Sequence, residues 1–154
     1  MTSISLAQAS IVVDAALTAG RKVGLMPLTV VVLDKGGHLV ALKREDKSGI
    51  LRVEIATGKA YAALGMGASS RLMRDRFADR GNFVSGLAAA SDGRFVPVPG
   101  GVLIKNGAGD IIGAVGISGD ASDKDEYCAI EGVKAATLSP DPAEPNPDWQ
   151  NAPL

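Results

Sequence analysis

The chain has 154 residues, of which 46% are hydrophobic and 21% are charged, and its formal net charge is −1 at pH 7. This composition is typical of one globular domain with a hydrophobic core and excludes a disordered chain. The even charge balance and the 4% of aromatic residues argue against the basic, aromatic-rich surface of nucleic-acid-binding proteins.

No segment of the sequence predicts insertion into a membrane or export. The uncharged stretch 25–33 is too short to span a bilayer, and residues 1–6 contain no Lys or Arg and precede no signal-peptide apolar segment. Cys128 is the only cysteine, so no internal disulfide can form. We therefore expect a cytoplasmic protein with no membrane partner.

The first part of the chain predicts a helix followed by a hairpin. Ser5 and Gln8 form a capping-box pattern, and apolar residues then recur at helical spacing up to Gly24. The β-branched run 29–33 predicts a strand, the turn at 34–37 contains adjacent glycines, and residues 38–44 predict the returning strand.

The middle of the chain predicts helices. An apolar stripe indicates a helix over 50–64, a second short basic helix follows from Ser69 or Ser70 to Phe77, and the segment 81–90 is ambiguous between a loop and a helical turn. The segment 95–99 alternates valine with proline and predicts an edge strand, because each proline removes a hydrogen-bond donor from the ladder.

The last part predicts a second hairpin, a helix and a tail. Strands are expected at 102–105 and 111–118, where Gly113 and Gly116 imply close approach of another backbone. A helix follows from Ser122 or Asp123 to about residue 136. Residues 139–154 hold five of the eight prolines and the only tryptophan, Trp149. We expect neither helix nor strand there, and a tail that docks on the domain 1–138 or on a neighbouring subunit.

These elements follow the order α-β-β-α-α-β-β-β-α. Hairpin connections between successive strands favour an antiparallel sheet. The expected fold is therefore α+β, with a five-stranded antiparallel sheet flanked by helices.

Four motifs in this order resemble those of the GlcG/HbpS-like family. They are the hairpin 31–41 with Arg44, the helical segment 54–61, the Pro99-Gly100-Gly101 turn with the strand after it, and the glycine-rich segment 113–119 followed by Asp125 and Glu126. The resemblance implies the same five-stranded fold and a homo-oligomer, and some members of the family bind haem. The segment 45–48 and the proline-rich tail depart from the family pattern.

Arg44 and Lys59 are candidate ligand-binding residues. Lys59 lies among alanines on an apolar helix, so its stem is expected to pack while its ammonium points at a specific partner. The two cations can hold the carboxylate or phosphate of an anionic small molecule. The alternative is a structural ion pair of Lys59 with Glu54, Asp125 or Glu126.

Further candidates come from turns and helix starts. Arg94 can join the anion clamp or lie on the surface, and Gly100 and Gly101 can form an oxyanion nest or a bend that lets a helix pass close. Asp125 and Glu126 can act as a general base, although helix capping is the simpler interpretation.

His38 is the only histidine and the candidate ligand for haem iron or another metal, although a histidine at the end of a turn is more often structural. Tyr61, Met66 and Met73 are alternative axial ligands, with helix packing as the simpler interpretation of each. Neither His38 nor Cys128 has neighbouring ligands in the sequence, which argues against a zinc site.

Two functions are therefore open. The first is a small-molecule-binding oligomer of the GlcG/HbpS type, with haem or another tetrapyrrole as a possible ligand. The second is a lyase, hydratase or isomerase without an organic cofactor. In that enzyme Arg44 and Lys59 would hold a small carboxylic acid, Gly100 and Gly101 would stabilise an oxyanion, and Asp125 or Glu126 would move a proton.

Overall fold

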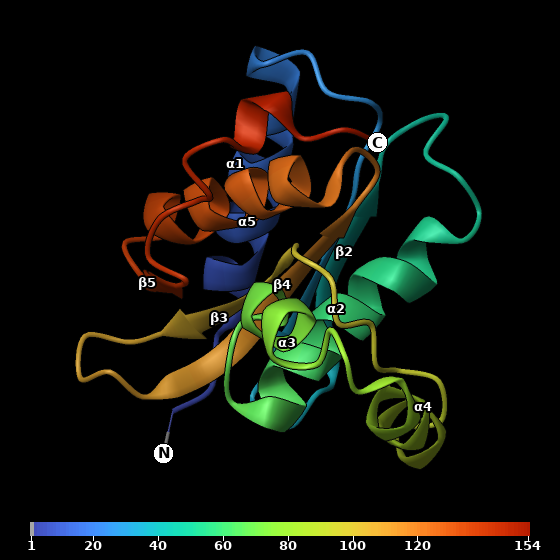
Figure 1. The fold of residues 1–154 in the computed structure, drawn as a ribbon. Helices are drawn as coiled ribbons and strands as arrows, with labels where there is room; N and C mark the ends of the chain where they lie inside the picture. The colour runs from blue at the N-terminus through green and yellow to red at the C-terminus, as the bar shows by residue number, and fades with distance from the viewer. Residues whose placement is uncertain (1) are drawn as a thin grey trace.

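The computed structural model describes residues 2–154, which form helices packed around one antiparallel sheet (Figure 1). The helices are α1 (Leu6–Lys22), α2 (Arg52–Met66), α3 (Ser70–Arg76), α4 (Gly81–Ala90), α5 (Ser122–Ala135) and the short 3-10 helix η1 (Trp149–Asn151). The strands are β1 (Thr29–Asp34), β2 (Leu39–Arg44), β3 (Gly101–Lys105), β4 (Ile111–Ser118) and β5 (Ser139–Asp141).

The sheet has the strand order β2-β1-β4-β3-β5, and every neighbouring pair is antiparallel. The fold class and the number of strands expected from the sequence are confirmed. The capping box at the start of α1 is also present, because the Gln8 amide donates to Ser5 Oγ and the Ser5 amide donates to Gln8 Oε1. Both glycine-turn hairpins form as expected.

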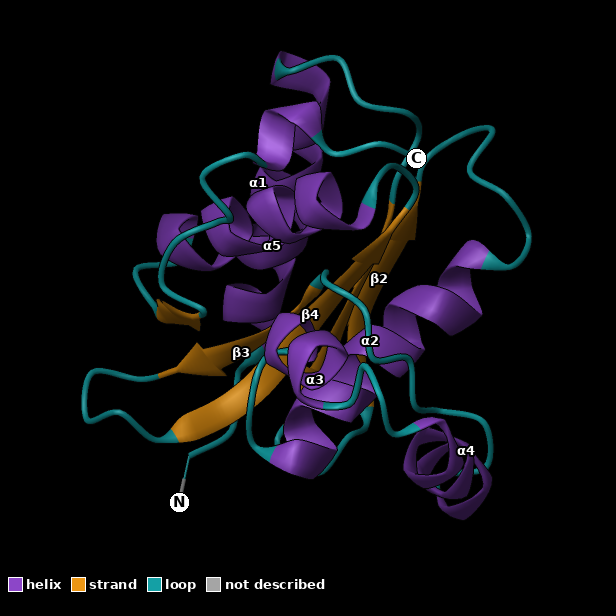
Figure 2. Ribbon diagram, in the orientation of Figure 1, coloured by secondary structure: helices purple, strands orange, loops and turns teal. Residues whose placement is uncertain are grey.

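Helices cover both faces of the sheet (Figure 2). Val30 and Val32 of β1 pack with α1 and α5, whereas Val31 and Leu33 pack against alanines of α2. All five residues from Thr29 to Leu33 are buried, so β1, an interior strand of the sheet, is covered on both faces and does not alternate between buried and exposed residues.

Glycines let α2 lie directly on the sheet. Gly101 and Gly116 are cross-strand partners, and a Cβ atom on either would run into the α2 backbone, at Lys59 and at Ala56 respectively. A Cβ on Gly113 would likewise press on the carbonyl oxygen of Leu33. The close backbone approach expected at Gly113 and Gly116 is confirmed.

Three segments differ from what the sequence predicted or left open. The segment 95–99 is not a strand, and the fifth strand is β5 in the tail, which pairs with β3 through Leu103–Asp141, Ile104–Pro140 and Lys105–Ser139. The ambiguous segment 81–90 is the helix α4. The expectation that the tail contains neither helix nor strand was therefore wrong, since β5 and η1 both lie in it.

The tail lies against the helix α5. The ring of Trp149 stacks on that of Tyr127 with centroids 3.9 Å apart and an interplanar angle of 5°. Lys105 Nζ also lies 2.7 Å from Asp141 Oδ2 beside β5. Within residues 2–154, no helix is both long enough and apolar enough to cross a membrane.

Candidate functional site

A buried ion pair joins helices from the two faces of the sheet. Lys59 Nζ of α2 lies 3.1 Å from Asp125 Oδ2 of α5 and donates to the carbonyl oxygen of Ile117 at 2.9 Å. The second carboxylate oxygen of Asp125 accepts from the Asp120 amide at 3.0 Å. Only 2% of the Lys59 side chain and 1% of the Asp125 side chain are exposed. This geometry supports the ion-pair interpretation of Lys59.

Burial shifts the pKa values of both partners toward their neutral forms. Loss of hydration lowers the pKa of Lys59, and it raises the pKa of Asp125 to about 6 in spite of the neighbouring ammonium. The pair is therefore costly to bury and depends on the hydrogen bonds around it.

The glycines before β3 pack against this ion pair. A Cβ on Gly100 would lie 2.9 Å from Lys59 Nζ, and the φ angle of Gly100 is +122°, a conformation that favours glycine. The Gly101 amide donates to Ser70 Oγ at 2.7 Å, and the carbonyl oxygen of Gly100 accepts from the Ile117 amide at 3.0 Å. Gly100 and Gly101 therefore form a bend that lets α2 pass close to the sheet.

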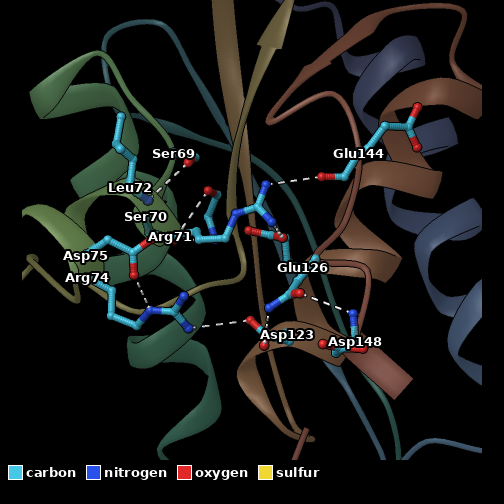
Figure 3. Close-up of polar contacts among 12 residues, drawn as sticks. Ser69, Ser70, Arg71, Leu72, Arg74, Asp75, Asp123, Glu126, Glu144 and Asp148 are labelled. Atoms are coloured by element: carbon cyan, nitrogen blue, oxygen red, sulfur yellow. Dashed lines mark hydrogen bonds and ion pairs between the residues drawn. The ribbon is translucent and has the colours of Figure 1, made fainter. Parts of the chain in front are cut away.

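Glu126 of α5 faces Arg71 of α3 (Figure 3). Its side chain is completely buried, and Arg71 Nη1 lies 3.4 Å from Oε1. Within residues 2–154, neither carboxylate oxygen has a hydrogen-bond partner. Burial raises the pKa of Glu126 to about 7, against the opposing effect of Arg71. Glu126 can therefore hold or release a proton near neutral pH.

Arg44 ends the edge strand β2 and is exposed. Its guanidinium donates to the carbonyl oxygen of Ser48 at 2.7 Å and borders an open cavity with Arg21 and Glu45. Lys59 does not line that cavity. The Lys59 ammonium faces Asp125 and not the cavity beside Arg44. A joint carboxylate clamp of Arg44 and Lys59 stays a prediction.

His38 ends the β1–β2 turn, and 81% of its side chain is exposed. The turn is held by Asp34 Oδ1, which accepts from the amides of Gly36 and His38 at 2.9 and 3.0 Å. His38 Nδ1 lies 3.3 Å from the same oxygen. These contacts orient the imidazole by one ring nitrogen, an arrangement common among metal-ligating histidines, whose other nitrogen binds the metal.

Tyr61 of α2 connects this turn to an apolar cleft. A Cβ on Gly37 would lie 2.9 Å from the Tyr61 ring, and the guanidinium carbon of Arg94 lies 4.3 Å from the centre of that ring. On the side of α4, Tyr61 lines a cavity of about 180 Å³ together with Gly65, Met66, Leu87, Ala90, Ser91 and Phe95. We call this cavity the α2–α4 cleft. Arg94 and Gly37, the residue before His38, therefore both contact the ring of Tyr61.

The remaining candidate ligands lie in the interior. Met73 is completely buried with Ala62, Phe77 and Phe95, so it packs a core and does not face the α2–α4 cleft. Cys128 is also buried, and burial raises the pKa of its thiol to about 12. Among residues 2–154, no group of three or more His, Cys, Asp or Glu side chains could hold a metal ion.

Sequence reasoning did not identify Ser70, Arg71 or Asp34 as parts of these arrangements. Asp34 had a local signal, because an aspartate that begins a glycine turn commonly accepts hydrogen bonds from the turn amides. Ser70 and Arg71 had none, since their partners Gly101 and Glu126 are far away in the sequence.

A family model described as "Haem degrading protein HbpS-like" matches residues 4–134. An uncharacterised 15.0 kDa protein in the dhaT-dhaS intergenic region of Citrobacter freundii is 30% identical over 105 residues, which are 68% of this chain and 72% of that protein. The GlcG/HbpS-like resemblance seen in the four motifs is confirmed by the family match.

Solved structures share the fold. The haem complex of PduOC superposes with a TM-score of 0.79 at 22% identity, over 90% of this chain and 98% of that chain. The Klebsiella pneumoniae protein ORFY gives a TM-score of 0.80 at 21% identity, over 89% of this chain and 92% of that chain. HbpS gives 0.74 at 25% identity, over 87% and 90%.

Proposed function

Because the chain belongs to the HbpS-like family, we propose that it binds haem or a related tetrapyrrole, and that the ligand lies in the α2–α4 cleft. The observation that carries this placement is the cleft itself, where an apolar wall adjoins Tyr61, Arg94 and the turn that bears His38. A tetrapyrrole needs these three features together: an apolar contact, a ligand for iron and a cation for its carboxylates.

The side chains near the cleft have the required chemistry. Tyr61 and Met66 line it directly, and both residue types serve as axial ligands of haem iron. His38, on the turn next to Tyr61, is the third candidate, because Asp34 contacts one ring nitrogen while most of the side chain is exposed. Arg94 is exposed beside Tyr61 and can pair with a propionate group. Bound haem would supply redox chemistry at this surface.

A cleft of about 180 Å³ holds only part of a macrocycle, so the rest of the ligand needs another cover. Helix α4 borders the cleft and contains no charged residue, yet none of its residues is buried. Figure 1 shows this helix set apart from the sheet. An exposed helix of that composition favours contact with a second copy of the chain, and we propose that a homo-oligomer covers the cleft.

Haemin titration of the purified protein tests this proposal. We expect a saturable shift of the Soret band for the unchanged protein and a weaker shift for Leu87→Glu, which places a charge in the apolar wall. Ala108→Glu is the matched control, because it adds the same charge to an exposed position in the β3–β4 turn, which does not line the cleft.

Haemin titration of the variants His38→Ala and Tyr61→Phe tests which side chain is the axial ligand of the iron. Loss of the Soret shift in one variant assigns iron binding to that side chain. No saturable shift in the unchanged protein would overturn haem binding. A shift that Leu87→Glu leaves intact would show that the ligand lies outside the α2–α4 cleft.

A further inference from the structure

A second cleft lies where the first turn of α5 meets α2, α3 and the last residues of the chain. It has a volume of about 410 Å³ and shares no lining residue with the α2–α4 cleft. Its walls contain two arginines from different helices, Arg52 of α2 and Arg74 of α3. We call it the Arg52–Arg74 cleft. The rest of its lining is residues 120–123 and 152–154.

Both arginines have hydrogen-bond donors to spare. Arg52 uses one N–H group on Ser118 Oγ at 3.1 Å, out of the five that a guanidinium carries. Arg74 uses Nε on Asp75 at 2.9 Å, and its Nη1 lies 3.6 Å from Asp123 Oδ1, which is longer than a hydrogen bond. Figure 3 shows Arg74 reaching from α3 toward Asp123.

The start of α5 adds backbone donors at the same place. Ser122 and Asp123 are the first residues of this 14-residue helix, and both line the cleft. Within residues 2–154, their amides have no hydrogen-bond partner, as is usual for the first turn of a helix. Together with the positive end of the helix dipole, these amides favour an anion.

Of the two acidic side chains of the lining, Asp120 has both carboxylate oxygens engaged. Asp120 accepts from the Met26 amide at 2.8 Å and from the Ala121 amide at 2.7 Å, one bond to each oxygen. Asp123 Oδ2 accepts from Asn146 at 3.2 Å, whereas its buried Oδ1 has no hydrogen-bond partner within residues 2–154 and lies 3.6 Å from Arg74 Nη1 as an ion pair. The donors left for a ligand are therefore the unused guanidinium N–H groups of Arg52 and Arg74 and the first amides of α5, and a bound anion competes with Asp123 for Arg74.

We propose that the Arg52–Arg74 cleft binds a small oxyanion, the carboxylate or the phosphate group of a small molecule. The anion lies between the two guanidinium groups, with the first amides of α5 as further donors. This site is independent of the proposed tetrapyrrole site. It also differs from the Arg44 and Lys59 clamp expected from the sequence, because its cations are exposed to a cavity.

Titration of the ¹⁵N-labelled full chain with sodium acetate and, separately, with sodium phosphate tests the proposal. Sodium chloride at matched ionic strength separates binding from screening. We expect saturable shifts of the Ser122 and Asp123 amide signals. Arg52→Gln and Arg74→Gln should each weaken the apparent affinity about tenfold, the effect of one lost hydrogen bond to a charged group. If only acetate or only phosphate produces saturable shifts, that response identifies the class of anion that the cleft binds.

Arg76→Gln is the matched control, because Arg76 is exposed on the same helix and does not line the cleft. It should leave both titrations unchanged. The dispersion of the amide signals reports whether each variant is folded. If Arg52→Gln does not fold, the titration of Arg74→Gln tests the proposal. Shifts that sodium chloride reproduces, or an affinity that neither arginine substitution changes, would overturn the proposal.

Discussion

Lys59 Nζ and Asp125 Oδ2 lie 3.1 Å apart in the interior, and their ion pair connects α2 on one face of the sheet to α5, which packs on the other face. The pair passes the end of β4, whose Ile117 carbonyl oxygen is the second acceptor of the ammonium. The Lys59 ammonium therefore links α2, β4 and α5.

Removal of one partner of this pair should be strongly destabilising. Lys59→Met keeps the length of the side chain but leaves the Asp125 carboxylate buried without its counter-charge, and we expect a loss of about 3–5 kcal/mol in the free energy of unfolding. The double variant with Asp125→Asn should recover part of this loss, because no isolated charge is left. Urea unfolding measures both. A stable Lys59→Met variant that loses carboxylate binding would instead favour the ligand-binding interpretation.

Glu126 should make the protein less stable as the pH rises. Its pKa is about 7 in the folded protein and 4.5 in the unfolded chain, so the folded state binds more protons between these values. The stabilising effect is complete below about pH 4.5 and is lost as the pH rises through about 7. Glu126→Gln should remove this dependence and raise the free energy of unfolding at pH 8 by about 2 kcal/mol.

Urea unfolding at several pH values between 5 and 8 measures this change. Glu131→Gln is the matched control, because Glu131 lies on the same helix and is partly exposed. An identical pH dependence for Glu126→Gln and the unchanged protein would mean that Glu126 is ionised in the folded state throughout this range.

Gly116 should not tolerate even an alanine. A Cβ at this position would overlap the Ala56 carbonyl oxygen, so α2 would have to move away from the sheet. We expect Gly116→Ala to cost about 3 kcal/mol, which is typical of overpacking against rigid backbone. Gly107→Ala is the control, since nothing lies within 4 Å of a Cβ there, and it should cost less than about 1 kcal/mol. Equal stability of the two variants would contradict the close contact of α2 with β4.

Elements that depend on nearby residues could be predicted from the sequence, whereas elements that depend on pairing between distant segments could not. The hairpin at residues 29–44 and the cap at Ser5 depend on residues a few positions apart, so the sequence contains their whole signal. Strand β5 contains Pro140 and has three residues, and it exists only because β3 offers an edge. The segment 95–99, with Phe95 and two valines, has the stronger local strand pattern and yet forms no strand.

The same limit applies to the site residues. The alanines around Lys59 indicated that its side chain is buried, but the choice among Glu54, Asp125 and Glu126 depended on how α5 packs. Arg52 and Arg74 form a cleft only because the start of α5 lies next to both helices. The spacing of these residues in the sequence contains no information about that contact.

Trp149 should hold the tail against α5. Its ring stacks on Tyr127, and such a pair contributes about 0.5–1.5 kcal/mol beyond the buried area. Trp149→Ala should therefore speed up proteolytic cleavage within residues 139–154, whereas Trp149→Phe should retain most of the protection. Limited proteolysis followed by mass spectrometry measures the rates. Gln150→Ala, at an exposed neighbouring position, should cleave like the unchanged protein. Protection that survives Trp149→Ala would assign docking of the tail to β5 and the ion pairs alone.

The uncharged helix α4 should lie in a contact between copies of the chain. Ala89 is exposed on this helix, so Ala89→Glu places a charge there without disturbing the core. In a homo-oligomer that buries α4, this charge would lose its hydration, and we expect the substitution to lower the mass measured by light scattering. Ala108→Glu is the control, because Ala108 is exposed in the β3–β4 turn, and it should leave the mass unchanged. A monomeric mass for the unchanged protein would refute the oligomer. An oligomer that Ala89→Glu does not dissociate would place the contact on another surface, and the α2–α4 cleft would then need no second copy.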